Sequence, residues 1–448
     1  MDHARAAAQL QAFLNGHAER AAWESGACRR TSPLAGAALI QTLVLGWLDN
    51  PDAALEDLAQ TGALLGHPVT PQALDQRFTP ELARCLESLL GQATRHLAAA
   101  GPAAAAVLRK FTAVLVQDST TVALPDALAG YWRGCGTSTG RGGEAAVKFQ
   151  VRLDLCTGRL CGLAVEAGRA SDKSTPLQAA DLRPGSLHLR DLGYFDLDVL
   201  RAIAAAGAFF LTRVQDGTGL STPDGEALSL AALARGAAGD VIDRPVRLGA
   251  RHRLAARLVM ARVPPAVAAR RRRALRAKAR RKGYTPSRDK LALCGWNVFV
   301  TNVPAERLDV DEVLALARAR WQVECLFRHW KSDGRLARSR GRKPWRVVGE
   351  VFARLLGLVL GDGQVIAACG ALAGRSLRRA WRALRRLAGA LATALPSRRA
   401  LARVLAQLAQ SLRKTARLEK RRGQPSSYQV LNDPQGCGHR KCPPKSRR

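Results

Sequence analysis

Two spacings of apolar residues divide this chain, a helical one toward both ends and an extended one in the middle. Residues 1–105 and 345–418 carry apolar faces at helical spacing, which predicts helices in both regions. Residues 113–116 are instead a continuous apolar run, which is typical of a strand buried on both faces. The chain is therefore expected to place helical regions on either side of a core that contains strands.

The middle of the chain predicts the order of the core elements. Further strands are expected near 146–155, 160–166, 187–191 and 209–214, with a helix over 198–206. A turn at Thr157 and Gly158 joins the second and third strands as a hairpin. Three antiparallel strands followed by alternating strand and helix is the order of the ribonuclease-H-like fold, which is mixed α/β. The first part of this core is expected over 106–215 and a further part over 304–345.

The second part of the core centres on one amphipathic helix, predicted from about Asp309 to Lys331. At about 100° per residue, a stripe about 40° wide contains Val313, Arg320, Glu324 and Lys331. The apolar face beside this stripe consists of Leu316, Val323, Leu326, Phe327 and Trp330. A carboxylate between two cations at the rim of an apolar face favours a functional site. The alternative is an exposed helix with a favourable charge pattern.

Two aspartates follow apolar strands upstream of this helix. The run at 113–116 is expected to end at Asp118, and a short strand with Leu187 and Leu189 on its apolar side delivers Asp191. Each aspartate has a structural alternative. Asp118, which precedes Ser119, could instead stabilise a turn through a side-chain hydrogen bond. Asp191 could likewise cap the turn that follows it.

These residues together resemble a known family. Arg320, Glu324 and Lys331 have the spacing of the tyrosine–arginine–glutamate–lysine signature of bacterial insertion-sequence transposases, the IS-four type of the DDE transposases. Ala317 occupies the tyrosine position, which departs from the pattern. The segments around Asp118 and Asp191 resemble the first and second aspartate motifs of the same family.

The resemblance implies a chemistry and a set of partners. Asp118, Asp191 and Glu324 would be the catalytic, metal-binding triad, with two Mg²⁺ ions and Mn²⁺ as a substitute. The enzyme would bind the terminal inverted repeats of its element as a homodimer on paired ends, cut the strands and transfer them to target DNA. A DNA hairpin at the element end is implied as an intermediate. Arg320 and Lys331 would contact phosphates near the cut.

Two other functions stay open beside this one. A related metal nuclease would cut DNA without joining strands. A catalytically inactive DNA-binding protein derived from a transposase would bind without cutting, and Ala317 at the tyrosine position keeps that alternative open.

The gap between Asp191 and Glu324 predicts an insertion in the core, over 216–303. Strand-like runs at 253–263 and 291–303 flank a basic helix, and the resemblance implies a mostly β insertion that clamps the transposon end. The helix contains four consecutive arginines, Arg270, Arg271, Arg272 and Arg273, which are expected to contact DNA or to form a solvated face. Trp296 is expected either to stack on a flipped base or to lie in the strand core.

Charge supports a nucleic-acid partner. The net charge is +34 and the pI is near 11.2, and so basic a chain usually meets a polyanion. Lys148 matches a recurrent lysine of the resembled family, a candidate DNA contact, or is a strand residue whose ammonium reaches solvent. In residues 1–105, Thr70 and Pro71 begin a helix that resembles the second helix of a helix-turn-helix, with an ordinary helical pair as the alternative.

The C-terminal residues differ in composition from the rest of the chain. Residues 419–448 are rich in Pro, Gly, Ser, Lys and Arg and are expected to be a disordered basic tail. Within it Cys437, His439 and Cys442 offer an alternative zinc site with irregular spacing.

Ten scattered cysteines suit reduced thiols, and the apolar stretch 347–374 is interrupted by charges. We expect a bacterial cytoplasmic protein associated with the nucleoid and no membrane partner.

Overall fold

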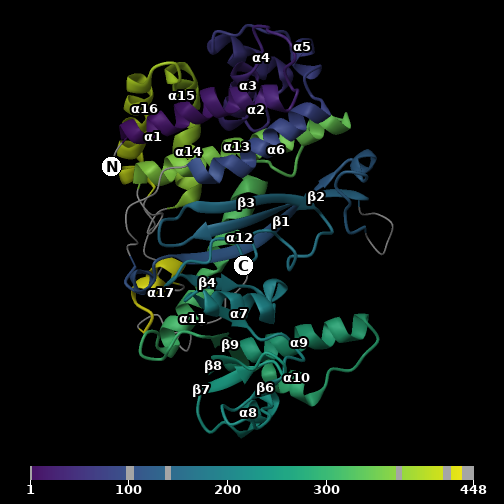
Figure 1. Cartoon of the computed structure of the whole chain (residues 1–448), viewed down its shortest axis with the longest axis vertical. Helices are drawn as coiled ribbons and strands as arrows, with labels where there is room; N and C mark the ends of the chain where they lie inside the picture. The colour runs from purple at the N-terminus through teal and green to yellow at the C-terminus, as the bar shows by residue number, and fades with distance from the viewer. Residues whose placement is uncertain (1–2, 97–104, 137–142, 370–375, 417–424, 436–448) are drawn as a thin grey trace. The chain divides into compact units, whose positions relative to one another are not determined.

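The computed structural model describes residues 3–96, 105–136, 143–369, 376–416 and 425–435 (Figure 1). The chain divides into two compact units. Unit 1 comprises Met1–Ala104, Asp118–Leu177 and Val323–Leu418. Unit 2 comprises Ala105–Gln117, Gln178–Gln322 and Glu419–Arg448. The strand β1 (Val114–Leu124) has residues in both units.

Unit 1 contains most of the helices and three strands. Its helices before the strands are α1 (His3–Ala12), the π-helix η1 (Phe13–His17), α2 (Ala18–Glu24), α3 (Ala37–Asp49), α4 (Leu55–Leu64), α5 (Pro71–Asp75) and α6 (Pro80–His96). Its strands are the second half of β1, β2 (Ala145–Asp154) and β3 (Leu160–Ala167), with the 3₁₀ turn η3 (Asp126–Leu128) between β1 and β2. Its later helices are α12 (Trp321–Ser332), of which Trp321 and Gln322 belong to unit 2, α13 (Pro344–Cys369), α14 (Leu377–Arg386), α15 (Ala388–Ala394) and α16 (Arg398–Thr415). The helices expected at both ends of the chain are confirmed.

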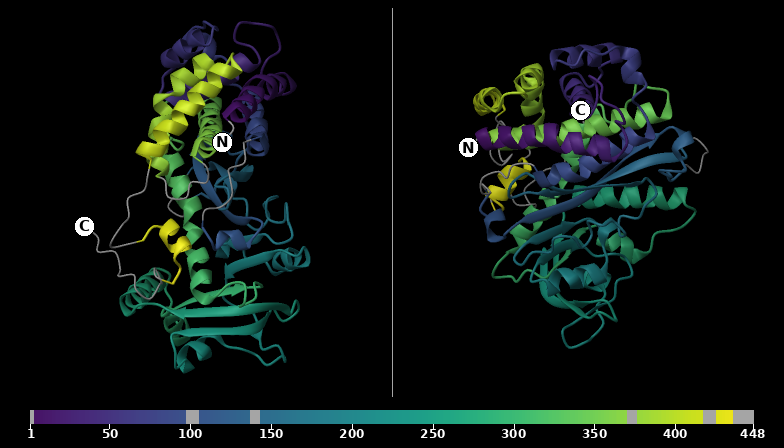
Figure 2. Two further views of the ribbon diagram at one scale, coloured as in Figure 1. Left: turned by 90° about the vertical axis from the view of Figure 1, so that its left-hand side faces the viewer. Right: turned by 45° about the horizontal axis from the view of Figure 1, so that its top comes forward.

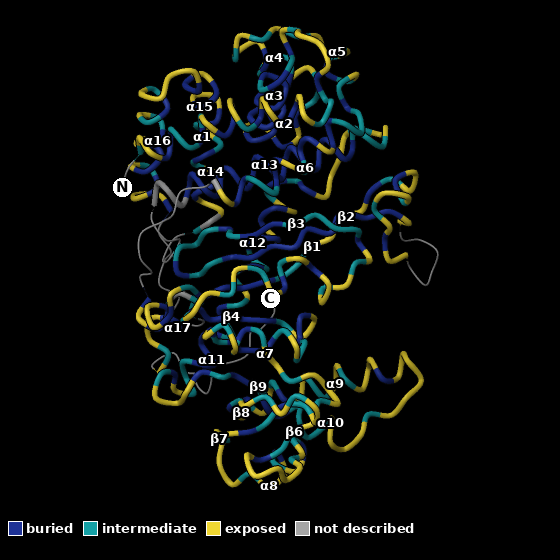
Figure 3. Tube along the Cα trace, in the orientation of Figure 1, coloured by how far each residue is buried: buried dark blue, intermediate teal, exposed yellow. Residues whose placement is uncertain are grey.

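The strands of unit 1 form a sheet buried under helices. Their order is β3-β2-β1, and β2 and β3 are antiparallel, paired from Val147 with Ala167 to Leu153 with Leu160. Gly158, in the turn between them, has a positive φ of 72°, which glycine adopts without strain. Along β2 every residue but the last is buried, as expected of a strand covered on both faces (Figure 3). One cover is α13, whose Phe352 lies 6.0 Å, ring to ring, from Phe149 on β2.

Unit 2 contains the remaining strands and shorter helices. Its strands are the first half of β1, β4 (Leu187–Arg190), β5 (Phe209–Arg213), β6 (Leu220–Ser221), β7 (Val241–Leu248), β8 (Leu254–Arg262) and β9 (Trp296–Thr301). Its helices and 3₁₀ turns are η2 (Leu108–Lys110), η4 (Leu192–Tyr194), α7 (Leu197–Ala205), α8 (Leu230–Gly236), α9 (Pro265–Arg281), α10 (Arg288–Leu293), α11 (Val310–Ala319) and α17 (Ser427–Asn432). The strand order is β1-β4-β5-β9-β8-β7-β6, with β1, β4 and β5 parallel and the later neighbours antiparallel.

The core of unit 2 joins its parallel strands to its antiparallel ones. Phe210 on β5, Ile203 on α7, Met260 on β8 and Val300 on β9 are all fully buried in one cluster. The order of elements along the chain, three strands followed by the strand β4, the helix α7 and the strand β5, is the order predicted from the sequence. The fold is therefore mixed α/β with a ribonuclease-H-like core.

The expected insertion region, 216–303, contains β6 to β9 and α8 to α10. The strand expected at 253–263 is β8, and the basic helix after it is α9. The second strand-like run is shorter than expected, because residues 291–293 end the helix α10, which Ser287 caps by accepting from Lys290 N at 3.3 Å.

Two expectations at the ends of the chain are corrected. Thr70 caps α5 as predicted, by accepting from Ala73 N at 3.2 Å, but α5 ends at Asp75 after five residues and is too short for a recognition helix. The tail was expected to be disordered from 419 onward, yet 427–432 form α17. Val430 and Leu431 of α17 are buried, so apolar contacts stabilise this short helix. Cys437, His439 and Cys442 lie outside the described residues. Within the described ranges, no helix has the length and apolarity to span a bilayer.

Candidate active site

The predicted single helix over 309–331 is two helices. The helix α11 ends at Ala319, Arg320 is the junction, and α12 begins at Trp321. At the junction the hydrogen bond from Arg320 N to Leu316 O is stretched to 3.3 Å, and a new first turn follows. Arg320 and Glu324 therefore do not share one regular helix. The predicted stripe is also interrupted on α11, because Val313 is fully buried.

Glu324 and Lys331 do share α12. The apolar face predicted for this helix is confirmed, since Val323, Leu326 and Phe327 are buried. Glu324 is half-buried in the first turns of the helix, and Lys331 is exposed near its end. Desolvation by the surrounding protein lowers the pKa of the Lys331 ammonium from its usual value. The carboxylate and the ammonium thus lie along the rim of a face that is fixed in the core.

A buried carboxylate fixes the far end of α12. Asp362 on α13 accepts a hydrogen bond from Trp330 Nε1 at 3.1 Å and another from Trp381 Nε1 at 2.7 Å. Burial raises the pKa of Asp362 to about 7. Beside Trp330, His329 contacts Asp333 at 3.0 Å between Nδ1 and Oδ2, and burial lowers the pKa of this histidine. These contacts attach α12 to α13 and α14, and so they position Glu324.

Asp118 lies within a strand and not at its end. The prediction that the strand stops at Asp118 is wrong, because β1 continues to Leu124. Thr120 and Val122 in this continuation are buried while Thr121 between them is exposed, the alternation of a half-buried strand. Asp118 itself is half-buried, and its Oδ1 accepts from the backbone N of Ser119 at 2.8 Å. The parallel pairing of β1 with β4 ends at Val116, two residues before Asp118.

A second acid, Asp172, lies next to this part of β1. Its Oδ1 accepts hydrogen bonds from Ser119 Oγ at 3.1 Å, Gln150 Nε2 at 3.0 Å and Lys148 Nζ at 3.2 Å. The Lys148 ammonium also donates to the carbonyl of Ala170. With a side chain only 11% exposed, Lys148 is engaged inside unit 1. A contact between Lys148 and DNA would require these hydrogen bonds to open.

Asp191 follows β4, as predicted. Its backbone is extended, with φ −82° and ψ 168°, and its side chain makes no capping hydrogen bond to η4. Asp196 caps the next helix, α7, instead. The Asp191 Oδ1 lies 3.8 Å from Arg320 Nε in unit 2. The neighbouring His188 and Arg190 are buried as well as Leu187 and Leu189, so β4 is covered on both faces.

The predicted DNA contacts of α9 separate into two kinds. Arg270 and Arg273 are exposed, as is most of the helix (Figure 3). Arg271 instead donates to Trp296 O at 2.9 Å and to Asn297 Oδ1 at 2.8 Å. Arg272 Nε donates to Leu291 O at 3.2 Å. Two of the four arginines therefore attach the helix to its own unit.

Trp296 is a core residue of unit 2. It begins β9, is 4% exposed and packs in the cluster of Phe210 and Met260. The guanidinium of Arg262 lies 4.5 Å above its ring. This is the strand-core alternative of the sequence prediction.

The three predicted carboxylates suit a hard divalent cation chemically, because carboxylate oxygens are the ligands that Mg²⁺ prefers. Asp118 and Glu324 belong to unit 1, and Asp191 belongs to unit 2. All three residues are half-buried, so none is withdrawn into an apolar core. Among the residues that the structure describes, no three His, Cys, Asp or Glu side chains gather closely enough to share an ion. The metal-binding role of the triad stays a prediction.

The sequence did not identify three acidic residues of unit 1 that hold structural positions. Asp172 is separated in sequence from the donors it binds, Asp362 is bracketed by two indoles, and Glu350 is 1% exposed. For two of them the sequence contained a usable signal, namely a single acidic residue inside a stretch of apolar residues at helical spacing. Glu350 and Asp362 interrupt such a stretch and were interpreted as evidence against a membrane span.

Comparison with known proteins assigns the family. Residues 109–360, more than half of the chain, match the family model described as Transposase DDE domain. The region includes Asp118, Asp191 and Glu324. The chain therefore belongs to the DDE-domain transposases, which are DNA-transposing enzymes that generally use a divalent metal ion.

Transposases of several insertion sequences are similar to this chain. The transposase for insertion sequence element IS231F of Bacillus thuringiensis subsp. israelensis is 27% identical over 320 residues, which is 66% of each chain. That for IS231B of Bacillus thuringiensis subsp. berliner is 24% identical over 365 residues, 76% of this chain and 75% of the relative. That for IS1151 of Clostridium perfringens is 24% identical over 271 residues, 56% of each chain. The first match thus spans about two thirds of the relative's length.

Proposed function

We propose that this chain binds the terminal inverted repeats of an insertion element and catalyses metal-dependent DNA strand cleavage and strand transfer. The observation that carries the proposal is Glu324 on α12, a helix fixed by the hydrogen bond between Trp330 and Asp362, within a region that matches the transposase DDE domain. A reacting group gains from a rigid support, because its geometry then needs no reorganisation during the reaction.

The proposed metal ligands are Asp118, Asp191 and Glu324. Bound Mg²⁺, or Mn²⁺ in its place, would supply Lewis-acid stabilisation of the charge that develops on the phosphodiester oxygens. The three carboxylates would hold such ions and offset most of their charge. An Asp or Glu is needed at each place because an amide offers only one neutral oxygen.

The proposed reaction is in-line displacement at phosphorus. In the first step a water oxygen bonds to the phosphorus and the bond to the 3′-oxygen of the neighbouring nucleotide breaks. One water proton goes to solvent, and the released 3′-oxygen takes up a proton from solvent to become a hydroxyl. The freed 3′-hydroxyl then attacks the phosphorus of a second phosphodiester and loses its proton to solvent. The new P–O bond replaces the bond to the 3′-oxygen of the attacked strand, which leaves and takes up a proton. Arg320 and Lys331 would hold the phosphates, Arg through two parallel hydrogen bonds and Lys as a point charge.

Double-stranded DNA is the proposed partner, both as element ends and as target. The net charge of +34 supports it, because phosphate contacts by Lys and Arg release counterions. We propose a homodimer on paired ends as the active assembly.

The test is nicking and joining of a labelled duplex that carries the inverted repeats flanking the coding sequence. Asp118→Asn, Asp191→Asn and Glu324→Gln keep the shape of each side chain and remove one negative charge. Each is expected to lower cleavage by orders of magnitude in Mg²⁺ while DNA binding in a gel shift persists or tightens. Glu306→Gln, at an exposed acid, is the matched control and should cleave like the parent. Parental cleavage by Glu324→Gln would contradict the proposed triad.

Because Ala317 replaces the tyrosine of the resembled signature, the same assay should also test two alternative functions. Ala317 is half-buried on α11, and its methyl group cannot supply the hydroxyl or ring of the tyrosine that the resembled signature has at this position. Binding with no Mg²⁺-dependent cleavage by the parental protein would identify an inactive DNA-binding derivative. Nicked product that never joins would identify a metal nuclease.

A further inference from the structure

The segment between α12 and α13 is strongly basic. We call residues 334–343 the basic loop; it contains five cationic residues and no acid. The cations are Arg335, Arg338, Arg340, Arg342 and Lys343. Two of them have acidic partners within unit 1, since Arg335 lies 3.3 Å from Asp52 and Lys343 lies 2.6 Å from Asp75. The other three, Arg338, Arg340 and Arg342, are exposed.

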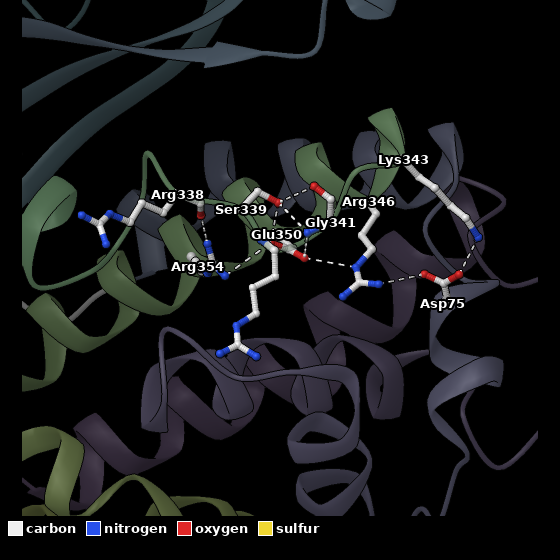
Figure 4. Close-up of polar contacts among 9 residues, drawn as sticks. Asp75, Arg338, Ser339, Gly341, Lys343, Arg346, Glu350 and Arg354 are labelled. Carbon is white, nitrogen blue, oxygen red and sulfur yellow. Dashed lines mark hydrogen bonds and ion pairs between the residues drawn. The ribbon is translucent and has the colours of Figure 1, made fainter.

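One buried carboxylate holds the backbone of the basic loop (Figure 4). Glu350, in the second turn of α13, is 1% exposed. Its Oε2 accepts from Ser339 Oγ at 2.6 Å and from Arg340 N at 3.0 Å. Its Oε1 accepts from Gly341 N at 3.1 Å. A carboxylate that accepts several N–H and O–H donors binds them more strongly than a neutral acceptor would.

Two arginines of α13 complete the support beneath the loop. Arg346 Nε lies 3.1 Å from Glu350 Oε1, and its NH1 lies 3.3 Å from Asp75. Arg354 is 3% exposed, contacts Glu350 at 3.4 Å and donates to the carbonyl of Arg338. Arg346 passes so close under the loop that a Cβ on Gly341 would lie 2.7 Å from its Cγ. The negative charge of Glu350 is thus neutralised by hydrogen-bond donors within the protein.

The start of the basic loop is attached to α12. Leu336 is fully buried, and its N donates to Trp330 O at 3.0 Å. Trp330 is the residue that Asp362 fixes. The loop therefore has a fixed backbone at both ends, on α12 through Leu336 and on α13 through Glu350.

Fixed backbone and exposed cations together favour an anionic ligand. In the part of the chain that the structure describes, no ion pair or hydrogen bond is assigned to the guanidinium of Arg338, Arg340 or Arg342. Three guanidiniums within five residues repel one another, and a row of phosphates relieves this repulsion. Because the backbone is already ordered, binding costs less conformational entropy than it would for a mobile loop.

We propose that the basic loop is a preformed binding surface for the duplex DNA backbone, with Arg338, Arg340 and Arg342 as its phosphate contacts and Glu350 as its positioning residue. This inference rests on the proposed function, because it takes DNA as the ligand. The contacts are sequence-independent, so any duplex serves as the probe.

The first test is the salt dependence of binding to a short fluorescent duplex of arbitrary sequence. The variant Arg338→Ala/Arg340→Ala/Arg342→Ala is compared with Arg398→Ala/Arg399→Ala/Arg413→Ala, which removes the same charge from exposed positions of α16. The loop variant is expected to lose about 0.9 from the slope of log K against log salt for each contact removed, a total of about two to three. The α16 variant is expected to change the slope by less than one such step, with both thermal midpoints parental. Equal slopes for the two variants would overturn the proposal.

The second test addresses Glu350 by hydrogen exchange of the Arg340 and Gly341 amides. Glu350→Gln removes the charged acceptor and is expected to speed this exchange and to lower DNA affinity about tenfold. Ser339→Ala removes only one hydroxyl donor to Glu350 and is expected to fold even if Glu350→Gln does not. It should change both readouts in the same direction by a smaller factor. Faster exchange with parental affinity would assign Glu350 to stability alone.

The two proposals fail in different ways. Glu324→Gln is expected to bind DNA with the parental salt slope and not to cleave it. A parental slope for the loop variant, with Glu324→Gln inactive, would refute the basic loop and leave the proposed function intact. Cleavage by Glu324→Gln would refute the proposed triad whatever the loop does.

Discussion

The indole N–H of Trp330 donates to the carboxylate of Asp362 across 3.1 Å in the interior of unit 1. Six residues before Trp330 on the same helix is Glu324, the proposed metal ligand. Asp362 accepts a second indole N–H from Trp381. The acid therefore joins α12, α13 and α14, and its protonation state should be measurable in the stability of the fold.

Stability should depend on pH through Asp362. Burial raises its pKa to about 7 from an ordinary value of 3.8. Between these values the folded state keeps a proton that the unfolded state releases, so the free energy of unfolding falls as the pH rises from about 4 to about 7. Asp362→Asn has no such proton. The thermal midpoint of the parental protein should fall relative to that of Asp362→Asn across this window, and parallel curves would contradict the assignment.

Removing the indole donor tests the support of Glu324. Trp330→Phe keeps the ring and removes the N–H, which leaves Asp362 with one indole partner, and it should cost about 1–3 kcal/mol of stability. Cleavage should fall more than DNA binding, because α12 loses part of its attachment. Trp321→Phe, at a tryptophan that is 46% exposed on the same helix, is the control and should leave both unchanged.

Lys148 should be a stability residue. Lys148→Met removes the ammonium that donates to Asp172 and to the carbonyl of Ala170. Because the Asp172 side chain is 31% exposed, water compensates part of the loss, and the variant should be destabilised by about 1–3 kcal/mol. The slope of DNA affinity against salt should stay parental. A variant that melts like the parent but binds DNA more weakly would instead support the DNA contact predicted from the sequence.

The arginines of α9 should divide by exposure. Arg270→Ala/Arg273→Ala removes two exposed cations and is expected to weaken DNA binding without changing the thermal midpoint. Arg271→Ala/Arg272→Ala removes the same charge but also the hydrogen bonds to Trp296, Asn297 and Leu291, so it should lower the midpoint. If the first pair binds DNA like the parent, the exposed face of α9 is only solvated.

Affinity for duplex DNA should fall steeply with salt. A net charge of +34 implies several phosphate contacts, and each contributes about 0.9 to the slope of log K against log salt. Fluorescence anisotropy between low and physiological salt measures this slope. A nearly flat dependence would contradict DNA as the partner.

The sequence by itself determined the order of the elements. Local periodicity and turn chemistry predicted β2, β3 and α7 within two residues of their observed ends, because a strand buried on both faces and an amphipathic helix each have their own spacing. Of the two alternatives for Trp296, a position in the core of a strand is the one that β9 forms. Short segments carry this information, since it depends on neighbours one to four residues away.

Tertiary structure decided where elements stop and which charges are internal. The break at Arg320 lies inside a continuous helical pattern, and β1 continues past Asp118 through residues that also suit a turn. Lys148 is buried because Asp172, 24 residues later, accepts from it, and Asp362 is buried because two indoles donate to it. Glu350 fixes the backbone of the basic loop. The sequence shows the cations of this loop but not where the fold positions them. A charge stays in an interior only when partners distant in sequence satisfy it, and the fold alone assembles those partners.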